Sequence, residues 1–360
     1  MSNLPTQDEN NTIPKSDEIF DSLTEVAKKT GEVIADTQVP KEIREGIGAA
    51  FRRLCIAYID PFAAGWEGKG AERRAESANR IRIMNEATDQ ICRQMNVDTK
   101  YAIVAADKYS ERVVREQLNI DKVVSVAADE VKSRSYENYQ IDEGAKAETP
   151  PIDDDWFNTF EKEACQKSSD NMQKLFGKVL ATKIVDTSAF SIKTLKLISQ
   201  LDFEVALLFK RLCSLSISLY VDDVIVDARV LAIGRDPNTN GLMDFGLDYK
   251  SLSILEEYGL IVSNYNSWRQ YIDALHGSTQ ECKSSYIMYQ NEKYGLVFDG
   301  RNSSPQDSQF IIKGLQLYGV RLTISGMELM SIIDLDLNEA YTNDMHEFLS
   351  NHKLTLKSFN

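Results

Sequence analysis

The residues that come closest to a known chemical pattern run from Asp236 to Gly241 and read Asp-Pro-Asn-Thr-Asn-Gly. This order matches the opening of a calcium-binding loop, in which alternating oxygen-bearing side chains and a turn glycine surround the ion. The twelfth position of such a loop needs a glutamate, and this chain has Leu247 there. We therefore expect a plain turn, in which Asn240 and Gly241 supply the positive φ angles.

Other residue types that perform chemistry are present without the spacing that the chemistry requires. His346 and His352 are six residues apart rather than four, so they do not share one helical face as a metal pair would. No nucleotide-binding glycine loop and no Gly-x-Ser-x-Gly motif occurs. The sequence predicts no catalytic residue, no cofactor and no metal, and it favours a protein that is not an enzyme.

The composition is typical of a soluble globular protein, with 42% hydrophobic and 27% charged residues in a chain of 360. Five scattered cysteines form no Cys-x-x-Cys pair, which indicates reduced thiols. No apolar run reaches the roughly 18 residues that cross a bilayer. The polar stretch from Met1 to Ser16 has no apolar signal core. We expect a cytoplasmic protein.

The net charge of −14 is distributed unevenly along the chain. Residues 41–134 hold 17 basic and 15 acidic side chains, a balance of +2, so the rest of the chain carries −16. A strongly acidic protein binds nucleic acid poorly unless one region supplies a basic face. Nucleic-acid binding is therefore an alternative function, and its candidate contacts are Arg52, Arg53, Arg73, Arg74, Arg80 and Arg82.

The elements that would position any site fall into two regions. We interpret residues 1–16 as a disordered tail, residues 17–134 as a helical domain and residues 135–151, which end in Thr-Pro-Pro, as a linker. Residues 152–360 form the second region. The architecture predicted from these patterns is mainly α, with an α+β C-terminal domain.

A long charged helix is predicted from Glu67 to Met95. Its apolar residues recur at alternating spacings of three and four, as in the seam of a coiled coil or a helical hairpin. We expect this helix to mediate contact with a second copy or a protein partner. The candidate contact residues are Ile81, Met84, Ile91 and Met95.

A short sequence echo follows this seam. Residues 94–98 and 117–121 share the order Gln, apolar, Asn, apolar, Asp. Each Asp, Asp98 and Asp121, is predicted to cap the helix that begins after it.

The apolar stretch from Gly46 to Trp66 has two interpretations. A buried helix that ends near Asp60 and Pro61 is the first. The alternative is a segment lying on a membrane with Arg52 and Arg53 at the headgroups, as in a toxin-like effector.

The stretch from Asp153 to Phe209 predicts successive helices, the first opened by Asp153 to Asp155, the second capped by Ser169 or Asp170, and the third preceded by Ser191. Its pattern resembles the bacterial domain-of-unknown-function family 2806 over roughly Glu67 to the C-terminus. The residues that carry the resemblance are Trp156, Met172, Gln173, Leu175, Leu180, Phe190, Ser191, Thr194 and Leu195. The chain departs from the family pattern at Phe176 and Gly177. A distant similarity to abortive-infection alpha proteins implies phage defence, and neither resemblance implies a catalytic residue.

The C-terminal third predicts the element order of a winged-helix module. A helix opened by Asp248 ends at Gly259 and is followed by a short strand, a hairpin over residues 285–298, and a last strand and helix from Val320. The helix offers Lys250 against several acids, which favours protein contact over DNA reading. The leading hypothesis is a non-enzymatic interaction or scaffold protein of a bacterial defence system.

Overall fold

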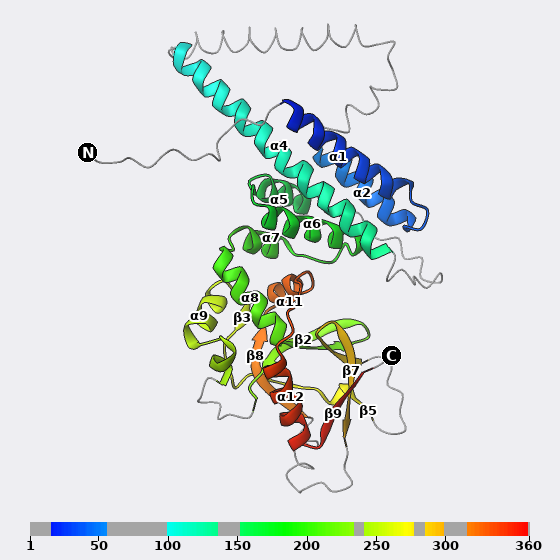
Figure 1. The fold of residues 1–360 in the computed structure, drawn as a ribbon, viewed down its shortest axis with the longest axis vertical. Helices are drawn as coiled ribbons and strands as arrows, with labels where there is room; N and C mark the ends of the chain where they lie inside the picture. The colour runs from blue at the N-terminus through cyan, green and yellow to red at the C-terminus, as the bar shows by residue number, and fades with distance from the viewer. Residues whose placement is uncertain are drawn as a thin grey trace, which may run out of the picture. The chain divides into compact units, whose positions relative to one another are not determined.

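The computed structural model describes residues 16–55, 99–135, 152–233, 241–276, 285–298 and 315–358 (Figure 1). The chain separates into two compact units, Met1–Ala189 and Phe190–Asn360. In the described residues the first unit is helical, and the second is built on a β-sheet with helices against it.

The helix α4 is the central element of the first unit, because it packs against α1, α2, α5 and α6. The described helices of this unit are α1 (Ser16–Ala35), α2 (Lys41–Leu54), α4 (Thr99–Ser135), α5 (Asp154–Ala164) and α6 (Asp170–Val185). The predicted linker, residues 135–151, lies outside the described residues except for its first residue. The helices α5 and α6 that follow it belong to the same unit as α4.

Of the caps predicted at Asp153 and Ser169, only Asp153 forms side-chain hydrogen bonds to the helix that it opens. The Asp153 side chain accepts hydrogen bonds from the backbone N–H groups of Asp155 and Trp156, at 2.8 and 3.1 Å, and so opens α5. Ser169 occupies the cap position of α6 without a side-chain bond. The prediction that Asp121 caps a helix is wrong, because α4 continues through this position and Asp121 lies in its interior.

Gly177 allows the closest approach between α4 and α6. A Cβ atom at this position would lie 2.5 Å from Cγ1 of Val126 and 3.1 Å from the carbonyl oxygen of Val123. The sequence suggests only that this glycine weakens its own helix by about 1 kcal/mol relative to alanine. The structure shows why a glycine nevertheless stands here, since any side chain at this position would push α4 and α6 apart.

The described residues of the second unit place nine strands in one sheet. Its order is β3-β8-β2-β1-β6-β7-β5, with β4 also paired to β8 and β9 also paired to β7. The pairs are antiparallel except for β5 with β7. The strands are β1 (Ile217–Val221), β2 (Val224–Leu231), β3 (Ile261–Val262), β4 (Trp268–Gln270), β5 (Leu275–His276), β6 (Ser285–Tyr289), β7 (Glu292–Phe298), β8 (Gln316–Leu322) and β9 (Leu354–Ser358).

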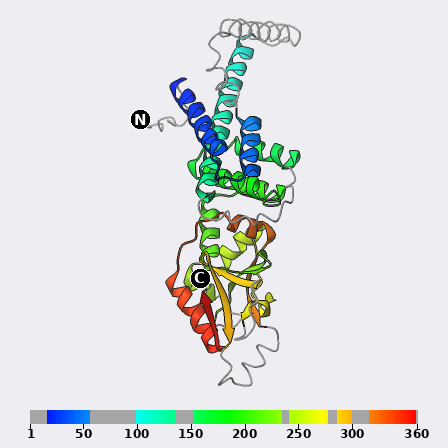
Figure 2. The ribbon, with the colours of Figure 1, turned by 90° about the vertical axis from the view of Figure 1, so that its right-hand side faces the viewer.

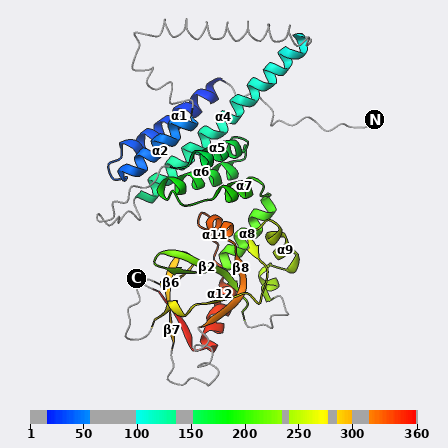
Figure 3. The same ribbon diagram turned by 180° about the vertical axis from the view of Figure 1, so that it is seen from behind.

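Helices cover this sheet. Figure 3 shows α12 beside the strands. Met345 and Leu349 of α12 line one small internal cavity together with Ile217, Leu231 and Leu296 of the strands. The helix α8 contacts β2, α9 contacts β3, and α11 contacts β8. The described helices of the unit are α7 (Ile192–Ser199), α8 (Phe203–Leu215), α9 (Tyr249–Glu257), α11 (Ile324–Met330) and α12 (Glu339–Asn351), with short 3-10 turns at Gly241–Phe245 and Ile272–Ala274.

The prediction of a mainly α protein with a winged-helix-like C-terminal domain is wrong. Several predicted elements exist, including α9 after its Asp248 cap, the β6–β7 hairpin and β8 followed by α11. They do not form a small helical core with a wing, because β3 and β8 belong to one large sheet that also contains the unpredicted strands β1 and β9. Long-range pairing between β2 and β8 creates this architecture.

Candidate interaction surface

Apolar side chains form a stripe along one face of α4 at spacings of three and four residues, with one seven-residue step across the polar residues Glu116 and Gln117. In the C-terminal half of α4 this stripe is in the core, with exposed fractions between 0 and 3%. These buried positions are Ile120, Val124, Ala127 and Val131. They explain how α4 holds α1, α2 and α6 together.

The same stripe continues toward the start of α4 through Val113, Tyr109 and Ala106, and there it faces solvent. Tyr109 is 61% exposed and Val113 is 40% exposed, while Ala106 is exposed as well. We call Ala106, Tyr109 and Val113 the exposed stripe. The residues from 104 to 110 are all exposed, although the helix is continuous through them.

The exposed stripe results from a difference in helix length. Lys29 pairs with Asp129 at 2.8 Å and Glu32 pairs with Lys132 at 2.7 Å, so α1 and α4 run side by side with an offset of 100 residue numbers. The first residue of α1, Ser16, is therefore level with residue 116 of α4. The earlier turns of α4 extend past the end of α1, as two views show (Figures 1 and 2).

Buried polar contacts fix the part of α4 just after the exposed stripe. The Asn119 side chain donates to the carbonyl oxygen of Cys165 at 2.8 Å. The Gln173 side chain donates to Oδ1 of Asn119 and to the carbonyl oxygen of Lys167, both at 3.0 Å. Such satisfied buried amides hold helices in one register. The family-motif residue Gln173 therefore positions α4.

Asp121 is the buried carboxyl group of this region. It is 1% exposed, and Gln117 donates to its Oδ1 at 3.0 Å while also donating to the carbonyl oxygen of Leu54 at the end of α2. Burial raises the pKa of Asp121, and the hydrogen bonds from Gln117 and the Cys55 thiol oppose that shift. Burial likewise raises the pKa of Cys55, which leaves this thiol un-ionised.

The other family-motif residues are structural. Trp156 is buried and stacks on Phe160 with ring centroids 5.1 Å apart, and the Lys183 ammonium lies 5.2 Å from the Trp156 ring. Ser191 caps α7 by accepting from the backbone N–H of Thr194 at 3.3 Å. Phe190, Leu180 and Leu195 are buried, and Met172 and Leu175 are half-buried. These positions support the fold and carry no reactive arrangement.

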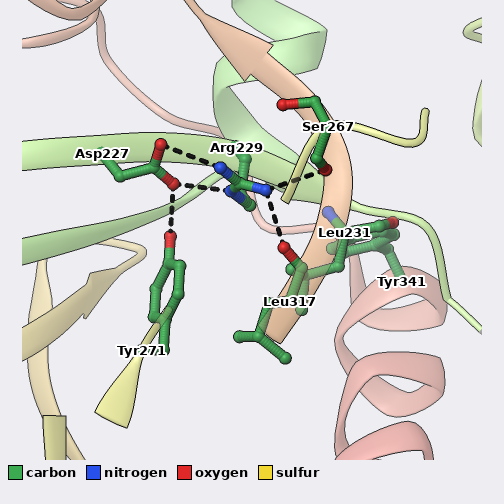
Figure 4. Close-up of polar contacts among 7 residues, drawn as sticks. All are labelled: Asp227, Arg229, Leu231, Ser267, Tyr271, Leu317 and Tyr341. Carbon is green, nitrogen blue, oxygen red and sulfur yellow. Dashed lines mark hydrogen bonds and ion pairs between the residues drawn. The ribbon is translucent and has the colours of Figure 1, made fainter. Parts of the chain in front are cut away.

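The second unit contains a buried ion pair (Figure 4). Arg229, 1% exposed, donates to both carboxylate oxygens of Asp227 at 2.6 and 3.0 Å. It also donates to the carbonyl oxygens of Ser267 and Leu317, at 3.0 and 2.7 Å, and Tyr271 donates to Asp227 at 3.0 Å. Burial, with the nearby Asp227 carboxylate second, raises the pKa of Tyr271 well above its usual range.

This network links neighbouring strands of the sheet. Its groups satisfy one another, and the carbonyl groups that Arg229 binds belong to β8 and to the residue before β4. Arg229 on β2 therefore joins β2 to β8 and to the β4 edge. A buried ion pair surrounded by satisfied hydrogen bonds determines strand placement more than it supplies reactivity.

Few of the candidate contacts predicted from the sequence lie in the described residues. Arg53 does, and its guanidinium bonds Asp154 and Asn158 of α5 and lies 4.8 Å over the Phe157 ring. Arg52 is exposed. The remaining candidates lie outside the described residues, and these are Ile81, Met84, Ile91, Met95, Arg73, Arg74, Arg80 and Arg82.

The metal patterns considered in the sequence give no site in the described part of the chain. No group of three or more His, Cys, Asp and Glu side chains there is arranged to hold an ion. The calcium-like residues 236–240 lie outside that part. A hollow between α8 and α9 is lined by apolar side chains with Glu204 and Arg211, and Arg211 donates to the carbonyl oxygen of Gly246 at 3.1 Å.

The exposed stripe is the feature that sequence reasoning missed. The spacing of residues 106, 109, 113, 120, 124, 127 and 131 is visible in the sequence and predicts one apolar face. What the spacing does not contain is the point at which neighbouring helices stop covering that face.

A family model described as "Protein of unknown function (DUF2806)" matches residues 105–346, which is 242 of the 360 residues. The chain belongs to this family. The match begins in α4 and includes every DUF2806 motif residue from Trp156 to Leu195, so the resemblance seen in the sequence is confirmed. Neither the curated proteins nor the solved structures contain a match. In the described residues of this DUF2806 chain, no helix has the length and apolarity to cross a bilayer.

Proposed function

We propose that this DUF2806 chain is a non-enzymatic interaction protein that binds a helix of another protein chain on the exposed stripe of α4. The carrying observation is that one apolar stripe is fully buried from Ile120 to Val131 and exposed at Tyr109 and Val113. Packing that is complete in one half of a helix and missing in the other supports a binding partner for the second half.

Helix energetics support the same proposal. Most of the stability of helices in proteins comes from packing an apolar face. In the register set by the two ion pairs, the residues of α4 before Glu116 lie beyond the first residue of α1. Covering the exposed parts of Tyr109 and Val113 with a partner would remove apolar surface from water, which favours association. These two side chains are therefore the anchor positions of the proposed contact.

Nucleic-acid binding through the N-terminal arginines remains an alternative proposal. The observation that bears on it is that Arg53 is already engaged with Asp154, Asn158 and Phe157. Phosphate contact by Arg53 would require breaking these bonds. The alternative predicts retention on DNA or RNA that falls steeply with salt, and absence of retention at low salt would exclude it.

Membrane action by residues 46–66 also remains an alternative. The described part of this segment, in α2, turns its apolar side chains into the helical unit, where Ile47, Ala50 and Leu54 are buried. This supports the buried-helix interpretation for residues 46–55. Flotation of the protein with liposomes tests the alternative, which requires the chain to rise with the vesicles.

A role in phage defence is proposed only from the resemblance to abortive-infection proteins. It predicts that deleting the gene in its host raises the plating efficiency of at least one phage. Equal plating on deleted and intact hosts across a broad phage panel would contradict the role and leave the interaction proposal intact.

The interaction proposal is tested by photo-crosslinking in living cells. A benzophenone amino acid at Tyr109 is expected to join the chain covalently to a protein. The matched control carries the same group at Val104, which is 54% exposed and lies about 140° around the helix from Tyr109. No protein adduct at Tyr109, or equal adducts at both positions, would overturn the proposal.

A further inference from the structure

The exposed half of α4 differs in charge from the rest of the chain. Residues 99–116 contain four basic side chains and three acidic ones, a balance of +1, whereas the whole chain carries −14. Two copies of most of this protein repel each other at close range because both are acidic. Two copies of residues 99–116 carry almost no net charge and so repel each other little. This segment is therefore suited to contact between identical chains.

The exposed stripe is complementary to itself when two α4 helices run antiparallel. If residue i of one chain lies opposite residue 215 − i of the other, Ala106 of each chain meets Tyr109 of its partner. The large Tyr109 side chain then faces the small Ala106 side chain in both directions, which allows two helices to interdigitate. A two-fold axis repeats every contact, as in the commonest symmetric dimers. A parallel pair in register would instead oppose Tyr109 to Tyr109.

The stripe also continues a seam that the sequence predicts before α4. Counting sevens from Ile81 gives Thr88, Met95, Ala102 and Tyr109. Tyr109 therefore lies in register with that predicted seam, whereas Ala106 and Val113 each lie one residue past the positions, 105 and 112, to which Met84 and Ile91 extend by sevens. Beyond Val113, the same face of α4 continues into the buried positions of the helical unit.

We propose that a second copy of this chain covers the exposed stripe, with the two α4 helices antiparallel and Ala106 of each chain packed against Tyr109 of the other. This inference rests on the proposed function, because it names the partner for the same surface. It goes further by fixing the stoichiometry, the symmetry and the register.

Sedimentation equilibrium of the purified full-length chain tests the partner. The expected mass is twice 40.7 kDa, about 81 kDa, at concentrations up to about 100 µM. A mass of 40.7 kDa throughout this range overturns the second-copy proposal. The proposed function survives that result if Tyr109 still crosslinks to a different protein in cells, and it falls as well if Tyr109 crosslinks to nothing.

Disulfide formation tests the register. The full-length double variant Ala106→Cys/Tyr109→Cys, oxidised mildly, is expected to run as a dimer on a non-reducing gel. Trypsin cuts after Lys108, so the antiparallel link joins peptide 101–108 of one chain to peptide 109–112 of the other. The controls are the unaltered chain, which reports the natural cysteines, and Ala106→Cys alone.

Each result of the disulfide experiment supports or overturns the arrangement. A 106–109 link between chains supports it. Efficient dimerisation of Ala106→Cys alone, with peptide 101–108 joined to itself, shows a parallel pair and overturns it. If the reduced double variant still sediments as a dimer and keeps its helical circular dichroism but forms no 106–109 link on oxidation, the register is overturned. If the reduced double variant sediments as a monomer while the unaltered chain sediments as a dimer, the loss supports Tyr109 as the anchor of the contact.

Discussion

Asp121 shows how one buried residue couples the stability of the helical unit to pH. Its carboxyl group lies in the interior of α4 beside Gln117 and Cys55, and burial raises its pKa above the ordinary 3.8. The folded state therefore holds the proton more tightly than the unfolded state does. Stability from this group is fully present below the unfolded pKa and is lost as pH rises through the folded pKa.

Replacing Asp121 with Asn should remove that pH dependence, because the amide stays neutral and still accepts from Gln117. At pH 8 the free energy of unfolding of Asp121→Asn should exceed that of the unaltered chain. Below about pH 4 the two should converge. Urea unfolding followed by circular dichroism at both pH values measures this. A variant that is less stable at pH 8 would show that the ionised carboxylate is favoured.

The Asp227–Arg229 pair makes a second prediction at the residue scale. Arg229→Met leaves the Asp227 carboxylate buried with Tyr271 as its remaining described side-chain partner and should cost about 3–5 kcal/mol. Adding Asp227→Asn to that variant should recover part of the loss, because an amide tolerates burial better than a carboxylate. The two substitutions should therefore be non-additive by more than about 0.5 kcal/mol in a double-mutant cycle. Additive losses would mean that the residues stabilise the sheet independently.

At the scale of elements, the contact between α4 and α6 depends on Gly177. Gly177→Ala improves helix propensity by about 1 kcal/mol, yet its methyl group would meet Val126 and the Val123 carbonyl. We expect the steric term to dominate and the free energy of unfolding to fall by about 1–3 kcal/mol.

Gly31 in α1 provides the matched control for Gly177. A Cβ atom there has nothing within 4 Å, so Gly31→Ala should stabilise the chain by up to about 1 kcal/mol. Denaturant unfolding of both variants gives the comparison. A stabilised Gly177→Ala protein would mean that α4 and α6 do not approach as closely as described.

The elements that were predictable from sequence are those with local signals. The helix α5 follows from its Asp153 cap and aromatic stripe, and α9 follows from Asp248 and Gly259. The strand β1 was missed because Ile217–Val221 directly follows the apolar helix α8 and continues its composition. The strand β9 was missed because its five residues are stabilised by pairing with β7, about 60 residues earlier in the chain.

The apolar character of the candidate surface was predictable from the sequence, but its position on α4 was not. Apolar spacing along α4 indicates a packed face, and the sequence placed partner contact at the seam from Ile81 to Met95, which lies outside the described residues. For that seam we predict that Met84→Lys or Ile91→Lys abolishes self-association without unfolding the C-terminal part of the chain, and retained association in sedimentation would contradict this. Exposure at Tyr109 and Val113 depends on where α1 begins, and no local pattern in α4 encodes that position.

At the scale of the whole molecule, the chain consists of a helical unit that carries the exposed stripe and a separate sheet-based unit. In the proposed dimer the two chains join through α4, and each chain contributes one sheet-based unit. The proposed biological activity depends on what this assembly brings together.

Sedimentation equilibrium of two matched single variants tests the central claim most directly. Val113→Glu places a charge on the exposed stripe, whereas Val104→Glu places the same charge about 180° around α4 at a similarly exposed position. We predict that Val113→Glu raises the dimer dissociation constant at least about tenfold, and that Val104→Glu sediments like the unaltered chain. Equal association by all three proteins, or loss of association by Val104→Glu alone, would contradict the account.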